Sequence, residues 1–216
     1  MDILDQIGLE GLSRWGHYLA GVTWIGLLYY FNFVQTPAFT EVSDATRSEA
    51  MRTVTWRALW WFRFGALLTL LTGLLILGFG EKLGGDQTDG YWTSPAGLGI
   101  LMGIILGVTM FLNVWLVIWP GQQVVIGSAR KVAEGGEADP NAAAAAKRAA
   151  RASRTNTLFS IPLLFFMAFP SHISPVLDTQ GEIDGGEYWL ALVIFLVVWA
   201  VLELSALGRI GGYDGP

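Results

Sequence analysis

The chain has 216 residues, of which 53% are apolar and only 14% are charged, whereas about 25% of an ordinary soluble domain is charged. Its formal net charge of −5 argues against nucleic acid as a partner. Ten tryptophans and 27 glycines fit a membrane protein, because tryptophan gathers at membrane interfaces and glycine is common in membrane helices. The absence of cysteine excludes disulfides, thiolate metal sites and a CxxCH haem-attachment motif.

Five apolar segments predict membrane-spanning helices, since a bilayer core of about 30 Å needs roughly 20 apolar residues. We expect an all-α integral membrane bundle that forms one domain over residues 1–216. Its spans are predicted at about 15–35, 58–80, 96–119, 155–172 and 188–207. The fourth span should begin as a water-exposed, alanine-rich helix near Pro140. The segment Pro37–Arg57 is interpreted as an amphipathic helix on the inner surface.

The placement of lysine and arginine predicts the orientation of this bundle. If the N-terminus lies outside, Arg14 and Lys82 are the only external basic residues. The internal segments then hold Arg47, Arg52, Arg57, Arg130, Lys131, Lys147, Arg148, Arg151, Arg154 and Arg209. This bias predicts an external N-terminus and an internal C-terminus.

The first span carries polar residues along one face. At 100° per residue, His17, Gly21, Trp24, Asn32 and Gln35 lie within an arc of about 80°. Such a stripe should face protein, a cofactor or water, because polar groups inside a membrane are costly in contact with lipid. The alternative is that His17 and Gln35 lie close enough to the two interfaces to be solvated there.

The second histidine, His172, follows the fourth span and should lie at the same outer side as His17. Two imidazoles on separate helices suit the axial ligation of a haem, and the small residue Gly21 would let a flat porphyrin approach the backbone. The alternative is two unrelated interfacial histidines. Two histidines alone are a weak basis for zinc or copper, which usually needs a third ligand.

A second polar cluster is predicted in the inner half of the bundle. Arg63 and Glu203 lie at matching depths, so we expect them to form an ion pair. Four amide residues, Asn32, Gln35, Asn113 and Asn156, lie in the same half of their spans. Together these residues suggest a pocket for a planar or anionic small molecule. The alternative is a structural hydrogen-bond network that ties the helices together.

Glycines Gly99, Gly103 and Gly107 recur every four residues in the third span. This spacing permits close helix approach. The ridge would serve internal packing, a homo-oligomer contact or a seat for a partner subunit.

Four segments carry a resemblance to a known family: "WGHYLAGVTWIGLLYYFNFVQTP", "RALWWFRFGALLTLLTGLL", "MFLNVWLVIWP" and "ASRTNTLFSIPLLFFM". They resemble bacterial PuuD-type urate hydroxylases, and the resemblance extends over most of the chain. It implies a membrane-embedded oxidoreductase domain, usually joined to a C-terminal cytochrome c domain, that oxidises urate to 5-hydroxyisourate. Because this chain has no CxxCH, we expect the built-in electron acceptor to be absent.

A weaker similarity concerns "HYLAGVTWIGLLYY" in the first span. It is similar to the first span of HemJ-type protoporphyrinogen oxidases, through His17, Thr23, Trp24, Leu28 and Tyr30. That resemblance implies haem b and an important first-helix histidine.

The resulting hypothesis is a haem-b redox protein with His17, and in one version also His172, as haem ligands. It would pass electrons from a small organic substrate to a c-type cytochrome or a quinone, with no catalytic group identified. The alternative is a non-catalytic accessory subunit of a larger respiratory or oxygenase complex, docked through the glycine ridge and the inner amphipathic segment. A transporter is disfavoured, because no inverted repeat or pair of broken helices is evident.

Overall fold

The computed structural model describes residues 5–83, 90–176 and 183–211, and within these ranges every regular element is a helix. Four of the elements, labelled η, are π-helical segments, in which an extra residue per turn locally widens and underwinds the helix. In chain order the elements are α1 Gln6–Tyr29, η1 Tyr30–Gln35, α2 Thr36–Glu41, α3 Asp44–Ala50, η2 Met51–Thr55, α4 Trp56–Phe79, α5 Pro95–Leu112, η3 Asn113–Ile118, α6 Trp119–Ala133, α7 Ala142–Ala168, η4 Phe169–Ile173 and α8 Gly185–Ala206.

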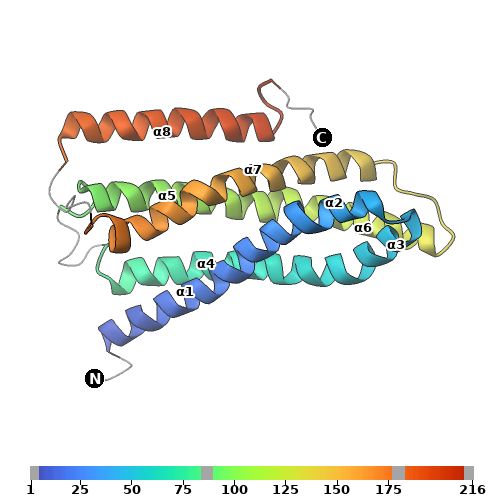
Figure 1. The fold of residues 1–216 in the computed structure, drawn as a ribbon, viewed down its shortest axis with the longest axis horizontal. Coiled ribbons are helices and arrows are strands. Elements are labelled where there is room, and N and C mark those ends of the chain that lie inside the picture. The colour runs from blue at the N-terminus through green and yellow to red at the C-terminus, as the bar shows by residue number, and fades with distance from the viewer. Residues whose placement is uncertain (1–4, 84–89, 177–182, 212–216) are drawn as a thin grey trace.

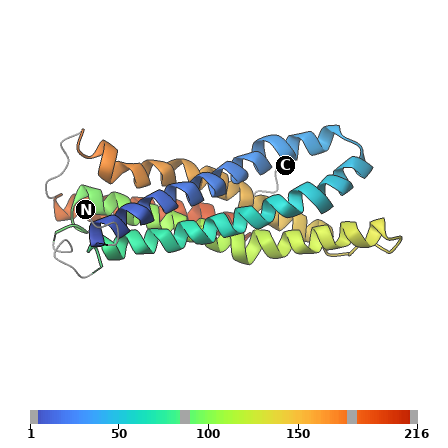
Figure 2. The ribbon, with the colours of Figure 1, turned by 90° about the horizontal axis from the view of Figure 1, so that it is seen from below.

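The π-helical segments join neighbouring α-helices into long rods, which Figures 1 and 2 show running side by side. The first rod extends from Gln6 to Glu41, and the second from Asp44 to Phe79. Between them the chain reverses at Val42–Ser43, where the Ser43 hydroxyl caps α3 by accepting from the backbone N–H of Thr46 at 3.3 Å. The predicted surface helix Pro37–Arg57 is therefore wrong. That segment is the tip of a helical hairpin, because helix continues through Pro37 and stops only after Glu41.

Four helices are long and apolar enough to cross a membrane, namely Asp44–Phe79, Pro95–Ala133, Ala142–Ile173 and Gly185–Ala206. They correspond to the last four predicted spans. The fourth predicted span, now Ala142–Ile173, does begin in a polar, alanine-rich stretch, although its helix starts at Ala142 and not at Pro140. The first rod equals the second in length, but it is not among the four helices selected by length and composition. A fifth span thus stays a prediction.

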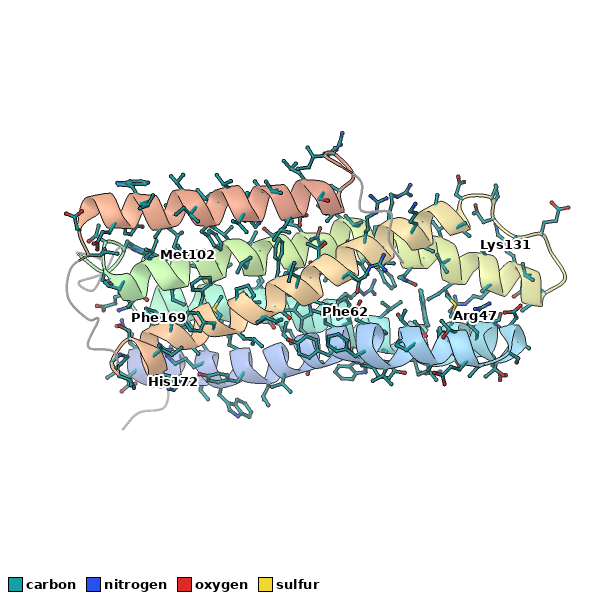
Figure 3. The ribbon with its side chains drawn as sticks, turned by 45° about the horizontal axis from the view of Figure 1, so that its top comes forward. Arg47, Phe62, Met102, Lys131, Phe169 and His172 are labelled. Carbon is teal, nitrogen blue, oxygen red and sulfur yellow. The ribbon has the colours of Figure 1, made fainter. Side chains whose placement is uncertain are left out.

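The rods differ greatly in length. The 22 residues of α8 extend over about 33 Å, which matches a bilayer core, whereas the 39 residues of Pro95–Ala133 extend over about 58 Å. In Figure 1 the other rods continue well beyond the end of α8. Figure 3 places Arg47 and Lys131 at this projecting end and His172 at the opposite one. We call the projecting end, with the α2–α3 turn and the α6–α7 connection, the basic end.

The glycine ridge of α5 packs inside the molecule against α7 and η4. A Cβ at Gly99 would lie 2.9 Å from the Phe169 ring, and one at Gly103 would lie 3.2 Å from the Met167 methyl group. Gly107 is less crowded, since its nearest neighbour would be Leu163 at 3.6 Å. This confirms internal packing as the role of the ridge, and it removes the ridge as a free seat for a partner subunit.

The main core lies where α1, α4, α5, η3 and α7 meet. Its largest fully buried side chains are apolar: Leu28, Phe62, Leu106, Met110 and Val114. Three polar residues, Asn113, Asn156 and Ser160, are buried among them. Their presence in an apolar core directs attention to the polar contacts that hold the helices together.

Candidate functional site

His17 lies in the interface between α1 and α4. Its Nδ1 atom is 3.2 Å from the Thr72 hydroxyl, and a Cβ at Gly73 would lie only 3.3 Å from its Cε1 atom. The Thr72 hydroxyl donates its hydrogen to a backbone carbonyl, that of Leu68 at 2.6 Å. Its oxygen therefore accepts from His17, which assigns the ring hydrogen to Nδ1 and leaves the lone pair on Nε2.

This arrangement fits a haem ligand. Metal-binding histidines almost always donate their second ring nitrogen to a nearby oxygen, which fixes the tautomer and the ring orientation. One helical turn away, a Cβ at Gly21 would meet nothing within 4 Å, so the backbone is open to a flat group. His17 itself is partly exposed. In the part of the chain that the structure describes, no group of three or more His, Asp or Glu side chains could hold a metal ion.

His172 lies in η4 and is exposed. Figure 1 places the start of α1 and the end of α7 at the same end of the bundle, as the sequence predicts. His17 contacts α4, however, whereas η4 packs against α5 and α7. Joint ligation by the two histidines stays a prediction.

Beyond Gly21, the first-span stripe faces protein. Trp24 and Leu28 are buried, with 2% and 0% of their surfaces exposed. Asn32 donates to the Ser153 hydroxyl of α7 at 2.8 Å, and Gln35 accepts from the Thr55 hydroxyl of η2 at 2.9 Å. The stripe therefore tethers the first rod to two different neighbours.

A buried amide–carboxylate network joins η3, α7 and α8. The Asn113 amide nitrogen lies 3.0 Å from Oδ1 of Asn156 and 3.1 Å from Oε2 of Glu203, and it donates to both. Asn156 donates in turn to the carbonyl of Met110 at 2.9 Å. Three of the predicted site residues thus meet in the core, where they satisfy one another and link three helices.

Arg63 lies apart from this network, and the predicted ion pair with Glu203 is wrong. Among the described residues the side chains of Arg63 and Glu203 form no ion pair; Glu203 accepts instead from Asn113. The Arg63 guanidinium carbon lies 3.7 Å from the centroid of the Trp119 ring. Matching depth along the bundle could not reveal that the two side chains leave their helices in different directions.

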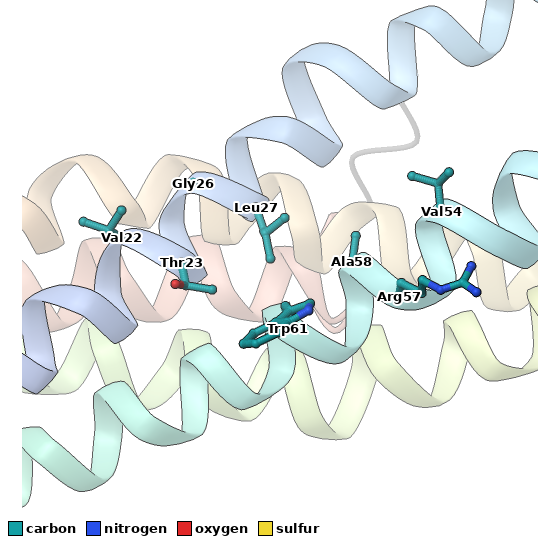
Figure 4. A pocket seen from close by; sticks show the side chains of 8 residues that line it. All are labelled: Val22, Thr23, Gly26, Leu27, Val54, Arg57, Ala58 and Trp61. Carbon is teal, nitrogen blue, oxygen red and sulfur yellow. The ribbon is translucent and has the colours of Figure 1, made fainter.

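The structure also contains features that the sequence did not predict. An open groove of about 560 Å³ lies between α1 and α4. Figure 4 shows the Trp61 ring lying between the two helices and Arg57 at one end of the groove. Two further polar links cross the bundle: Tyr29 to Ser160 at 2.9 Å, and Trp199 to Thr109 at 3.0 Å. Isolated tyrosine, tryptophan and threonine residues in apolar runs give little sign of such pairing.

The π-helical segments hold four of the predicted site residues. Asn32 and Gln35 lie in η1, Asn113 begins η3, and His172 lies in η4. Single π-turns inside α-helices are frequent at functional sites, because the extra residue alters the direction in which nearby side chains point. Three of the four amide residues selected from the sequence therefore lie where helix geometry changes, whereas Asn156 lies within α7.

Together, the helices and their buried polar network define a multi-pass helical membrane protein. A family model described as "Urate oxidase N-terminal" matches residues 91–204, which is more than half of the chain. The chain belongs to this family. The match runs from α5 through most of α8 and includes Asn113, Asn156, His172 and Glu203. It does not extend to α1, the helix of His17. Neither the curated proteins nor the solved structures contain a match to the chain.

Proposed function

We propose that this protein is a urate hydroxylase-type oxidoreductase of the bacterial inner membrane that binds haem b through His17. It would take electrons from a small organic substrate and pass them to a c-type cytochrome or a quinone. Membership of the urate oxidase N-terminal family supports the substrate class. The observation that carries the haem assignment is the hydrogen bond from His17 Nδ1 to Thr72, which leaves Nε2 as the metal-binding atom.

In this proposal the first rod also spans the membrane, which gives five spans in all, and its N-terminal end lies outside. The exposed face of this rod near His17 is largely apolar, because Trp15, Tyr18 and Val22 expose 63%, 63% and 73% of their surfaces. These side chains suit lipid or the edge of a bound porphyrin. Haem b would supply one-electron transfer there, and His17 would hold and orient it near the outer surface, within reach of an external electron acceptor.

The substrate-binding role predicted for Asn32, Gln35, Asn113, Asn156 and Glu203 remains part of the proposal. Asn113, Asn156 and Glu203 form one network, and Asn32 and Gln35 lie on a neighbouring rod. Amide and carboxylate groups recognise the alternating donors and acceptors of a purine ring. Binding would require these groups to exchange their present partners for the substrate.

The experiment is a reduced-minus-oxidised spectrum of the protein purified in mild detergent after expression with sufficient haem. We expect a b-type band in the wild type, its loss in His17→Ala, and a 10- to 100-fold weaker haem affinity in Thr72→Val, which loses the partner of Nδ1. His172→Ala is the matched control, and it keeps the band if His17 is the only protein ligand. A wild-type protein that folds without binding haem would overturn the haem assignment.

A second assay addresses the substrate separately. Urate and an added cytochrome c are mixed with the haem-loaded protein, and cytochrome reduction is followed. Urate-dependent reduction that Asn113→Ala lowers would support the inner polar residues as the substrate site. Reduction by another organic donor, but not by urate, would exclude urate and leave haem binding intact.

A further inference from the structure

Arg63 contacts aromatic rings from two rods. Its guanidinium carbon lies 3.7 Å from the centroid of the Trp119 ring, 4.9 Å from that of Phe64 and 5.8 Å from that of Trp115. Contacts this close between a guanidinium and ring faces hold the planar group in place and leave its edge, which carries the N–H donors, for another partner.

That partner is missing from the described part of the chain. Nε of Arg63 and Nε1 of Trp115 are both buried there without a hydrogen-bond acceptor. The nearest candidate carboxylate by depth, Glu203, is bound by Asn113 instead. A guanidinium inside a membrane helix needs an anion, since an unpaired charge is costly in that medium. Two neighbouring donors without acceptors indicate where the anion would bind.

The position of Arg63 selects the kind of anion. Arg63 lies six residues, or about 9 Å, further into α4 than Arg57. Its neighbour Phe62 lies near the level at which α8 ends in Figure 3, close to one boundary of the spanning region. Trp60, three residues before it on α4, and Leu116, the residue after Trp115, expose 47% and 69% of their surfaces. An anion that reaches Arg63 through such apolar surroundings must itself be amphiphilic.

A second arginine extends the cluster toward the basic end. Trp119 packs on Trp56 with ring centroids 5.2 Å apart, and Arg130 lies 4.5 Å from the centroid of the Trp56 ring on α4. The resulting stack is Arg63, Trp119, Trp56 and Arg130. It carries two positive charges and no carboxylate, so its charge is complementary to an anionic headgroup.

We propose that this stack binds the phosphate of an anionic phospholipid from the leaflet at the basic end. Arg63 would donate to the phosphate oxygens from its edge, and Trp119 would hold the guanidinium plane. The acyl chains would lie over the exposed apolar surface around Trp60 and Leu116. This site does not depend on haem or on urate, so its test is independent of the test of the proposed function.

The test is native mass spectrometry of the full-length protein, titrated with phosphatidylglycerol or phosphatidylcholine of the same acyl chains. We expect the wild type to bind one phosphatidylglycerol about fivefold more tightly than phosphatidylcholine, the preference expected from roughly one basic residue at a lipid phosphate. Arg63→Gln should abolish this preference. Trp119→Leu, which keeps the charge but removes the stack, should weaken it, and this variant also serves if Arg63→Gln does not fold.

Arg57→Gln is the matched control, because Arg57 is exposed on the same helix and its side chain donates to the carbonyl of Thr53 at 3.4 Å. Its preference for phosphatidylglycerol should equal that of the wild type. Equal loss in Arg57→Gln and Arg63→Gln would show general attraction to the basic end and would overturn the site. A wild type without any preference would overturn it as well. Displacement of the lipid by millimolar inorganic phosphate would identify a free phosphate site and contradict the lipid assignment.

Discussion

Among single residues, Asn156 is a polar side chain that is completely buried in the core, since none of its surface is exposed. Its amide donates to the Met110 carbonyl and accepts from Asn113. In Asn156→Leu both partners lose their bond inside the core, so we expect the free energy of unfolding to fall by about 1–3 kcal/mol. Denaturant titration of the protein in mild detergent, followed by circular dichroism, measures this loss.

Asn32→Leu is the control for that prediction. Asn32 is only partly buried, and its amide donates to the Ser153 hydroxyl and to the carbonyl of Leu28. The expected loss is about 0.6 kcal/mol, the average for a hydrogen bond between membrane helices. Losses of equal size in the two variants would contradict the view that burial sets the cost.

Glu203 offers a second test at this scale. Glu203→Gln keeps an oxygen that accepts from Asn113, so we expect its free energy of unfolding to stay within about 0.5 kcal/mol of the wild type. Glu203→Leu removes the acceptor and should cost about 1–3 kcal/mol. The same denaturant titration compares them. A large loss in Glu203→Gln would mean that the negative charge itself, and not the acceptor, stabilises the bundle.

The sequence predicted which residues are polar within spans, but not how they pair. Helix depth, counted along the chain, places Asn113, Asn156 and Glu203 in one half of the bundle, and their side chains contact one another there. Arg63 was placed with them for the same reason, although its side chain turns to Trp119. The direction of a side chain depends on helix rotation and on the π-helical segments, and neither leaves a clear periodic signal.

Among the elements, α1 and α4 pack together along an extensive interface, and their backbones approach closely at Gly65. A Cβ at Gly65 would lie 3.2 Å from the backbone nitrogen of Trp24 and 3.4 Å from the carbonyl oxygen of Ala20. Backbone atoms cannot yield as a flexible side chain can, so Gly65→Ala should force the helices apart and cost about 1–3 kcal/mol. The free energy of unfolding in detergent is again the measurement.

Gly26→Ala is the matched control on the partner helix. A Cβ at Gly26 would meet nothing within 4 Å, and alanine favours helix over glycine by about 1 kcal/mol. We therefore expect Gly26→Ala to leave stability unchanged or to raise it. If Gly65→Ala behaves in the same way, α1 and α4 do not approach each other as closely as the structure has them.

For the whole molecule, helix content and four of the apolar spans followed from composition and segment length. The projecting basic end did not, because its helices are simple continuations of membrane helices through η1, η2 and η3. Small residues stabilise it: a Cβ at Gly121 of α6 would lie 3.1 Å from the Ala149 methyl group of α7. An alanine run predicts a helix, but it does not identify the neighbour on which that helix packs.

Whether the first rod crosses the membrane decides between four spans and five, and single cysteines can measure this because the chain has none of its own. Ile7 is 73% exposed near the start of α1, and Val42 is 38% exposed at the α2–α3 turn. If the rod spans the membrane with the N-terminus outside, a membrane-impermeant maleimide should label Ile7→Cys in spheroplasts, whereas Val42→Cys should react only after lysis. Thr93→Cys and Ala138→Cys, at opposite ends of Pro95–Ala133, serve as references for the outside and the inside. Labelling of Ile7→Cys and Val42→Cys from the same side would mean that the first rod does not cross the bilayer. The position of His17 near the outer surface, which electron transfer to an external cytochrome requires, would then be contradicted.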